Sequence, residues 1–174
     1  MLFVEEAIGP DCPEGFRELR QRTEVPVCVG EVINTPKELI DRMQGGVYTF
    51  VQPDASVIGG ISSVMEIFDA ALDIDMDVVV HAWGGASAIM ANYHVAFAGG
   101  GSLVEYPMLN FPLTTKMLNG HRAIVDGNLA CSDEVGLGLT LTPEIETEFA
   151  SDPTAVYCCI LNNSPRSLDS EWKI

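Results

Sequence analysis

The chain has few basic side chains. Its 174 residues include 9 lysines and arginines against 25 aspartates and glutamates, and the formal net charge at pH 7 is −16. Cationic side chains supply most of the affinity for nucleic acids, so this balance argues against a nucleic-acid partner. It argues equally against an anionic membrane surface. Solubility explains most of the excess acid, although a few carboxylates could form a cluster that binds a cation.

Long apolar runs, paired-cysteine motifs and a secretory signal are also absent from the sequence. No apolar run approaches the ~20 residues that a membrane-spanning helix needs, and the N-terminus has no recognisable signal peptide. The number of cysteines is odd and no CxxC spacing occurs, which predicts neither a disulfide framework nor a zinc site. The cysteines are Cys12, Cys28, Cys131, Cys158 and Cys159. We therefore expect a soluble protein of the reducing cytoplasm.

Short apolar runs that alternate with helical patterns make up most of the chain. Val47–Val51 and Val78–Val80 are rich in β-branched residues, as is typical of strands. Thr35 followed by Pro36 predicts a capped helix start, and residues 61–72 carry apolar side chains at helical spacing. With 47% apolar residues available for a core, the alternation predicts an α/β fold of about five parallel βα units.

A polar residue follows each predicted strand, at intervals of 23 to 27 residues. The five are Glu5, Glu31, Asp54, His81 and Glu105. This interval is roughly the length of one strand plus its returning helix. Parallel strands wound this way end along one rim of the sheet, so we expect the five side chains to converge. On a (β/α) barrel this rim carries the catalytic groups.

The predicted strands are too few for a closed barrel, which has eight strands and takes about 250 residues. We therefore predict the C-terminal part of a (β/α) TIM-type barrel over residues 1–150, incomplete without its N-terminal strands. Turn signals between residues 120 and 138 predict a hairpin or extended excursion, and residues 143–149 predict a short helix. Residues 151–174 lack periodicity, which predicts a poorly ordered tail.

Glu5 and Glu31 end adjacent predicted strands and form a carboxylate pair. Two carboxylates side by side repel each other, which raises the pKa of one of them unless a cation lies between them. Oxygen ligands without sulfur favour Mg²⁺ over zinc. Strand-end acids can also simply face solvent, but their regular spacing with an aspartate and a histidine favours the metal site.

Asp54 and His81 end two further neighbouring strands. A carboxylate beside a histidine fixes the tautomer of the imidazole and raises its basicity, so the pair predicts an acid/base dyad that moves a proton next to a carboxylate. Glu105 could donate a hydrogen bond to a developing enolate if its pKa were raised, or it could be an exposed acid. We interpret His94 and His121 as structural histidines. Trp83 can either wall a pocket or belong to the core.

These residues, in this order, resemble the mandelate racemase subgroup of the enolase superfamily. The likeness covers roughly residues 2–145 and depends on five motifs that agree in spacing. The motifs are Phe3-Val4-Glu5-Glu6, Pro26 to Glu31, Val51-Gln52-Pro53-Asp54-Ala55 with Ile58-Gly59-Gly60, Val80-His81, and Leu103-Val104-Glu105. The resemblance implies that Glu5 and Glu31 are Mg²⁺ ligands and that Asp54 and His81 are the acid/base dyad. It also implies that Glu105 supports an enediolate.

The family has parts that this sequence does not contain. The resemblance implies an N-terminal capping domain that sets substrate specificity and three preceding barrel strands. It also implies a third metal carboxylate and a lysine that faces the histidine, and Ala7 stands where the family usually has proline. We therefore expect little turnover by this chain alone. A complementing N-terminal half or a homo-oligomer is the expected protein partner, because unpaired strand edges favour association.

The function implied by the resemblance is Mg²⁺-dependent removal of a proton α to a carboxylate through an enediolate. Dehydration of an acid sugar is the preferred outcome, and racemisation of a 2-hydroxy acid is the variant; the substrate is a small-molecule carboxylate. The alternative is a non-catalytic truncated remnant, or a half-barrel that associates with itself. A third reading is a binding module around Trp83. Metal-dependent stability and α-proton exchange separate these hypotheses.

Overall fold

The structure is a computed structural model that describes residues 1–109, 111–119, 124–130 and 133–152. The chain divides into two compact units, Met1–Thr140 and the part that begins at Leu141. In the second unit the described helix is α6 (Pro143–Glu148), which is capped by the Thr142 hydroxyl. The division at residue 150 and the tail at 151–174 stay predictions, because residues 153–174 lie outside the described part.

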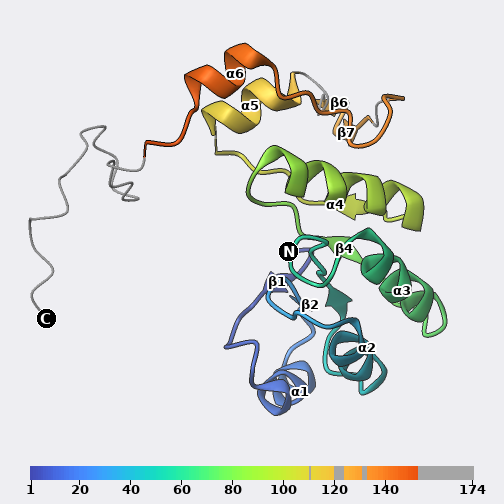
Figure 1. The fold of residues 1–174 in the computed structure, drawn as a ribbon. Helices are drawn as coiled ribbons and strands as arrows, with labels where there is room; N and C mark the ends of the chain where they lie inside the picture. The colour runs from blue at the N-terminus through green and yellow to red at the C-terminus, as the bar shows by residue number, and fades with distance from the viewer. Residues whose placement is uncertain (110, 120–123, 131–132, 153–174) are drawn as a thin grey trace, which may run out of the picture. The chain divides into compact units, whose positions relative to one another are not determined.

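The first unit alternates strands and helices as the apolar pattern predicted. The five strands are β1 (Val4–Glu5), β2 (Val27–Val29), β3 (Phe50–Val51), β4 (Val79–Val80) and β5 (Leu103–Val104). The five helices are α1 (Pro13–Arg22), α2 (Pro36–Gln44), α3 (Ile61–Leu72), α4 (Ala86–Gly99) and α5 (Pro112–Leu118). In Figure 1, α1 to α4 follow one another along the outside of the strands. The predicted α/β fold of about five parallel βα units is confirmed.

The strands pair in parallel and in chain order. β1, β2 and β3 form one ladder and β4 pairs with β5. A parallel bridge between Val51 and Val78 joins the two ladders, and the His81 amide continues it by donating to the Pro53 carbonyl at 3.1 Å. The resulting order, β1 to β5, places the carboxyl ends of all five strands along the same edge.

Local sequence features explain where these elements begin and end. The Thr35 hydroxyl accepts from the Glu38 amide and Pro36 occupies the first turn of α2, as is typical of a helix start. Gly30 has φ +147°, and a Cβ there would lie 3.0 Å from the backbone nitrogen of Gln52. The missing side chain therefore lets the end of β2 approach β3 closely, just before Glu31.

The core lies between the strands and helices α1 to α4. Phe16, Leu39, Tyr48 and Ile67 are all 0% exposed within it, and the rings of Phe16 and Tyr48 meet edge to face at 5.5 Å. A second apolar cluster packs α4 against α5 and the segments that follow it. Every residue of β2 and β4 is buried, as is usual for parallel strands that are covered on both faces.

After α5 the chain forms an antiparallel hairpin of β6 (Ile124–Val125) and β7 (Asn128–Leu129). Its turn consists of Asp126 and Gly127, which both have positive φ, so the predicted hairpin is confirmed. His121, Cys131, Cys158 and Cys159 lie outside the described residues. In the described part Cys12 and Cys28 are free thiols, and no helix there has the length and apolarity that membrane crossing requires.

Candidate functional site

The structure brings the strand-end residues to one place. Glu5, Glu31, His81 and Glu105 line a single cavity of about 630 Å³. Asp54 does not line the cavity; its side chain is buried directly behind His81. Parallel strands in register put successive strand ends side by side, which is why residues up to 100 positions apart in sequence meet here.

Asp54 holds His81 from behind. The His81 Nδ1 lies 2.7 Å from Asp54 Oδ2, while Asp54 Oδ1 accepts from the Ser56 amide and hydroxyl, both at 2.7 Å, and from the Asn92 amide at 2.8 Å. Burial by itself raises the pKa of Asp54, but the hydrogen bonds from His81, Asn92 and Ser56 lower it to about 2. Asp54 is therefore a fixed anion that orients the imidazole.

The opposite edge of the imidazole ring, which carries Nε2, points into the cavity. Its Nε2 lies 3.2 Å from Glu31 Oε2 and 3.7 Å from Glu105 Oε2. Burial lowers the pKa of His81, but the hydrogen bond to Asp54 and the charges of Glu105, Glu31 and Asp54 outweigh it, so the net shift is upward. A protonated imidazole held this way can deliver a proton from Nε2 into the cavity.

Glu105 has the properties of an acid that stays protonated more readily than usual. The Ala82 amide donates to its Oε2 at 3.1 Å. Burial raises the pKa of Glu105, and the charges of Glu5 and Glu31 add to this effect. The Ala82 hydrogen bond and the charge of His81 act in the opposite direction, and the net shift is upward. A carboxylic acid with a raised pKa can donate a hydrogen bond to developing negative charge.

Two polar residues of this site were not singled out in the sequence. Asn92, in α4, is 0% exposed; it donates to Asp54 and accepts from the Ala55 amide at 2.7 Å. Gln52 is also 0% exposed, and its Nε2 donates to Glu5 Oε2 at 3.3 Å and to Glu105 Oε1. The sequence feature that could have identified both residues is an amide side chain among apolar residues. Such an amide, if buried, needs hydrogen-bond partners.

The carboxylates fit a hard divalent cation by their chemistry. Glu5 and Glu31 supply oxygen ligands at the same cavity, and Mg²⁺ is commonly bound by one or two carboxylates together with water and substrate oxygens. Cys28, which pairs with Glu5 in the sheet, is not a competing ligand, because burial raises the pKa of its thiol to about 12. Within the part of the chain that the structure describes, no group of three or more His, Cys, Asp or Glu side chains is arranged to hold a metal.

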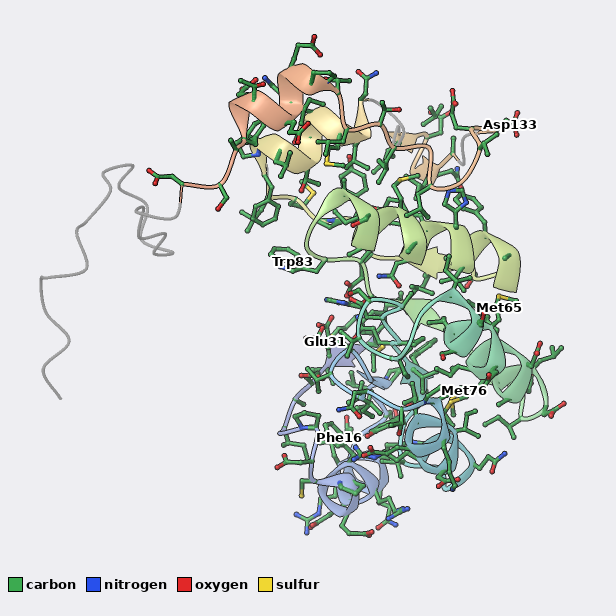
Figure 2. The ribbon with its side chains drawn as sticks, viewed as in Figure 1. Phe16, Glu31, Met65, Met76, Trp83 and Asp133 are labelled. Carbon is green, nitrogen blue, oxygen red and sulfur yellow. The ribbon has the colours of Figure 1, made fainter. Side chains whose placement is uncertain are left out.

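Trp83 forms part of the wall of the cavity rather than the core. Its side chain is 44% exposed and its ring meets Phe111 edge to face at 5.6 Å. Figure 2 shows Trp83 and Glu31 on the same side of the strands, while Met76, which precedes β4, lies on the other side. The sequence left pocket and core open for this residue, and the structure supports the pocket.

Comparison with known proteins shows a family to which this sequence is similar. The family model described as enolase C-terminal domain-like matches residues 1–145. The chain is 29% identical over 147 residues to an arabinonate dehydratase of Saccharolobus solfataricus, covering 84% of this chain and 39% of that protein. It is 27% identical over 148 residues to an L-talarate/galactarate dehydratase of Salmonella typhimurium, covering 83% and 34%. The chain thus spans well under half the length of these relatives.

Solved structures agree with the fold. An enolase from Pantoea ananatis, crystallised with D-gluconate and magnesium, superposes with a TM-score of 0.74 at 21% identity, covering 86% of this chain and 36% of that one. At this identity the likeness concerns the fold alone. The parallel strands and helices of this chain superpose on a portion of that longer chain.

Proposed function

The chain belongs to the family of enolase C-terminal domain-like proteins, and from this premise we propose that it provides part of the active site of an acid-sugar dehydratase. The proposed reaction removes the proton α to a carboxylate and expels the β-hydroxyl as water. The observation that carries the proposal is His81, which is held by Asp54 and faces Glu31 and Glu105 in the cavity. The names of the two dehydratase relatives support the substrate class.

Each side chain of the cavity has a role in this proposal. Glu5 and Glu31 would hold Mg²⁺, which would supply positive charge to stabilise the negative charge that develops on the substrate carboxylate. Glu105 donates a hydrogen bond to the same developing charge. His81 then gives its Nε2 proton to the departing β-hydroxyl, which leaves as water, and Asp54 stabilises the charged form of the ring until this transfer.

The same arrangement also fits racemisation of a 2-hydroxy acid, in which His81 delivers its Nε2 proton to the α-carbon instead of to a hydroxyl. The base that first removes the α-proton is not among the groups assigned here. We therefore expect efficient turnover only when the chain is complemented by the N-terminal part of a relative, added as a separate polypeptide.

The test is to purify this chain together with the N-terminal part of the arabinonate dehydratase and to supply acid sugars in D₂O. We expect exchange of the α-proton by NMR and formation of a 2-keto-3-deoxy product, and His81→Asn should abolish the product because it removes the proton donor. The matched control His94→Asn changes a histidine of α4 that does not line the cavity. Exchange without a keto product would favour racemisation. A stable complex without α-proton exchange would refute the proposal.

A further inference from the structure

The side chain of Gln52 connects the two ends of the strand order. It follows β3, the middle strand, and donates from Nε2 to Glu5 at the end of β1 and to Glu105 at the end of β5. These two carboxylates are separated by 100 positions in the sequence and lie on the outermost strands. One carboxamide nitrogen therefore links two groups that no backbone hydrogen bond of the sheet links.

The geometry of a primary amide suits this task. Its NH₂ group has two donor hydrogens in a fixed planar fork, so each can serve a different acceptor. Two carboxylates near each other repel. A donor between them offsets that repulsion and fixes the orientation of both carboxylate groups. Because Gln52 is 0% exposed, water does not compete for either hydrogen bond.

The other end of the same amide argues against a purely structural role. Gln52 Oε1 is buried and has no hydrogen-bond partner within the described residues. A buried polar atom without a partner lowers stability, and an apolar side chain of similar size would avoid that cost. A residue kept only for packing at this position would be expected to be apolar, like its neighbour Val51.

We propose that Gln52 is a positioning residue that fixes the carboxylates of Glu5 and Glu105 relative to each other. It thereby aligns a metal ligand with the acid that faces the developing charge. The metal part of this inference rests on the proposed function, whereas the link between the two carboxylates does not. Residues that orient metal ligands from behind typically contribute 10- to 100-fold in metal affinity.

The first measurement follows the side-chain amide of Gln52 by NMR in the metal-free chain. We expect two amide proton resonances that exchange slowly with solvent and that move when Glu105→Gln or Glu5→Gln replaces an acceptor. The control is Glu66→Gln, an exposed position on α3. The proposal would be overturned if the Gln52 amide protons exchanged rapidly with solvent and their chemical shifts stayed the same in both variants.

The second measurement compares Gln52→Leu with the unmodified chain by calorimetric titration with Mg²⁺ and by melting in EDTA. We expect Mg²⁺ affinity to fall 10- to 100-fold while the melting temperature in EDTA stays equal or rises. The control Thr114→Val also replaces a buried polar side chain, but on α5, and should leave the affinity unchanged.

The outcomes separate this inference from the proposed function. A lower melting temperature in EDTA with unchanged Mg²⁺ affinity would mean that Gln52 only supports the fold, and would overturn the proposal. If the unmodified chain binds no Mg²⁺ while the amide resonances respond to Glu105→Gln, the link between the carboxylates stands and the Mg²⁺-dependent function fails. If both respond as expected, both are supported.

Discussion

At the scale of single residues, the charge of Asp54 is the most constrained feature of the site. Its carboxylate is buried and receives hydrogen bonds from His81, Ser56 and Asn92. Burial opposes the charge, yet the hydrogen bonds lower the pKa from 3.8 to about 2. A carboxyl with a lowered pKa in the folded state adds stability above its unfolded pKa and loses it as the pH falls toward 2. The shift corresponds to about 2 kcal/mol.

Asn92→Ala tests this network. The substitution leaves the Ala55 amide unpaired and removes one donor from Asp54, so we expect the free energy of unfolding at pH 7 to fall by about 2–4 kcal/mol. The pKa of Asp54 should rise, and the difference from the unmodified chain should narrow as the pH approaches 2. Urea titrations at several pH values measure both effects.

The control for that experiment is Asn128→Ala, which removes an exposed asparagine side chain that donates to the Asp126 carbonyl. It should change stability by no more than about 0.5 kcal/mol. Equal losses in the two variants would show that the buried amide of Asn92 does not stabilise Asp54.

The individual residues differ in how far sequence could identify them. The positions of Asp54 and His81 followed from periodicity, because strand ends of a parallel sheet repeat with the length of a βα unit. Asn92 has no such signal: it is one polar residue in a helix of small side chains, and its partner is 38 positions away. Gln52 directly follows the apolar run that ends at Val51, and whether its side chain points inward depends on pairing that the sequence does not state.

At the scale of elements, the positions of α2 and α3 followed from sequence, whereas α5 and the lengths of the strands did not. The start of α2 was fixed by the cap at Thr35 and by Pro36, both local features. The run Val47–Val51 predicted a five-residue strand, but β3 comprises Phe50 and Val51. Val47 and Tyr48 are fully buried instead, so an apolar run records burial, whereas strand length depends on where neighbouring strands begin to pair.

Helix α4 packs against α3 so closely that its last residue must be glycine. A Cβ at Gly99 would lie 2.4 Å from ring carbons of Phe68. Although alanine favours helices by about 1 kcal/mol over glycine, Gly99→Ala should lower the free energy of unfolding by about 1–3 kcal/mol, because the ring must move. Chemical denaturation measures this change.

The steric cause can be isolated with a double-mutant cycle. In the background of Phe68→Leu, which removes part of the ring, Gly99→Ala should be less destabilising than in the unmodified chain. If the cost of the alanine is the same in both backgrounds, the contact with Phe68 is not its cause.

At the scale of the whole molecule, the described strands β1 to β5 of the first unit form a parallel sheet with β1 and β5 at its two edges. Among the described residues β1 pairs with β2 alone and β5 with β4 alone, and Leu2 and Leu103 beside these edges are 58% and 40% exposed. Such edges favour association with further strands, while a net charge of −16 opposes association with a second copy of the same chain. We therefore expect these edges to pair with strands of a complementing N-terminal half rather than with a second copy of this chain.

The order of the strands and the meeting of their ends were predictable because parallel βα units permit few arrangements. The substrate could not be predicted in the same way, because the chain spans about two fifths of the length of the arabinonate dehydratase that it resembles. What the chain can still reveal by itself is whether its strand-end carboxylates bind a cation, because a ligand that binds only the folded state raises its stability.

We expect the melting temperature to rise by a few degrees between EDTA and millimolar Mg²⁺. A ligand at about ten times its Kd for one site adds about 1.4 kcal/mol to the free energy of unfolding. Glu31→Gln should abolish the rise, because it replaces one of the two carboxylates at the cavity by a neutral amide. Glu66→Gln, the exposed control on α3, should retain it. The control is needed because Mg²⁺ also screens a chain of this charge without a site. A rise that persists equally in both variants would therefore reflect screening, and the carboxylates would not form a metal site in this chain.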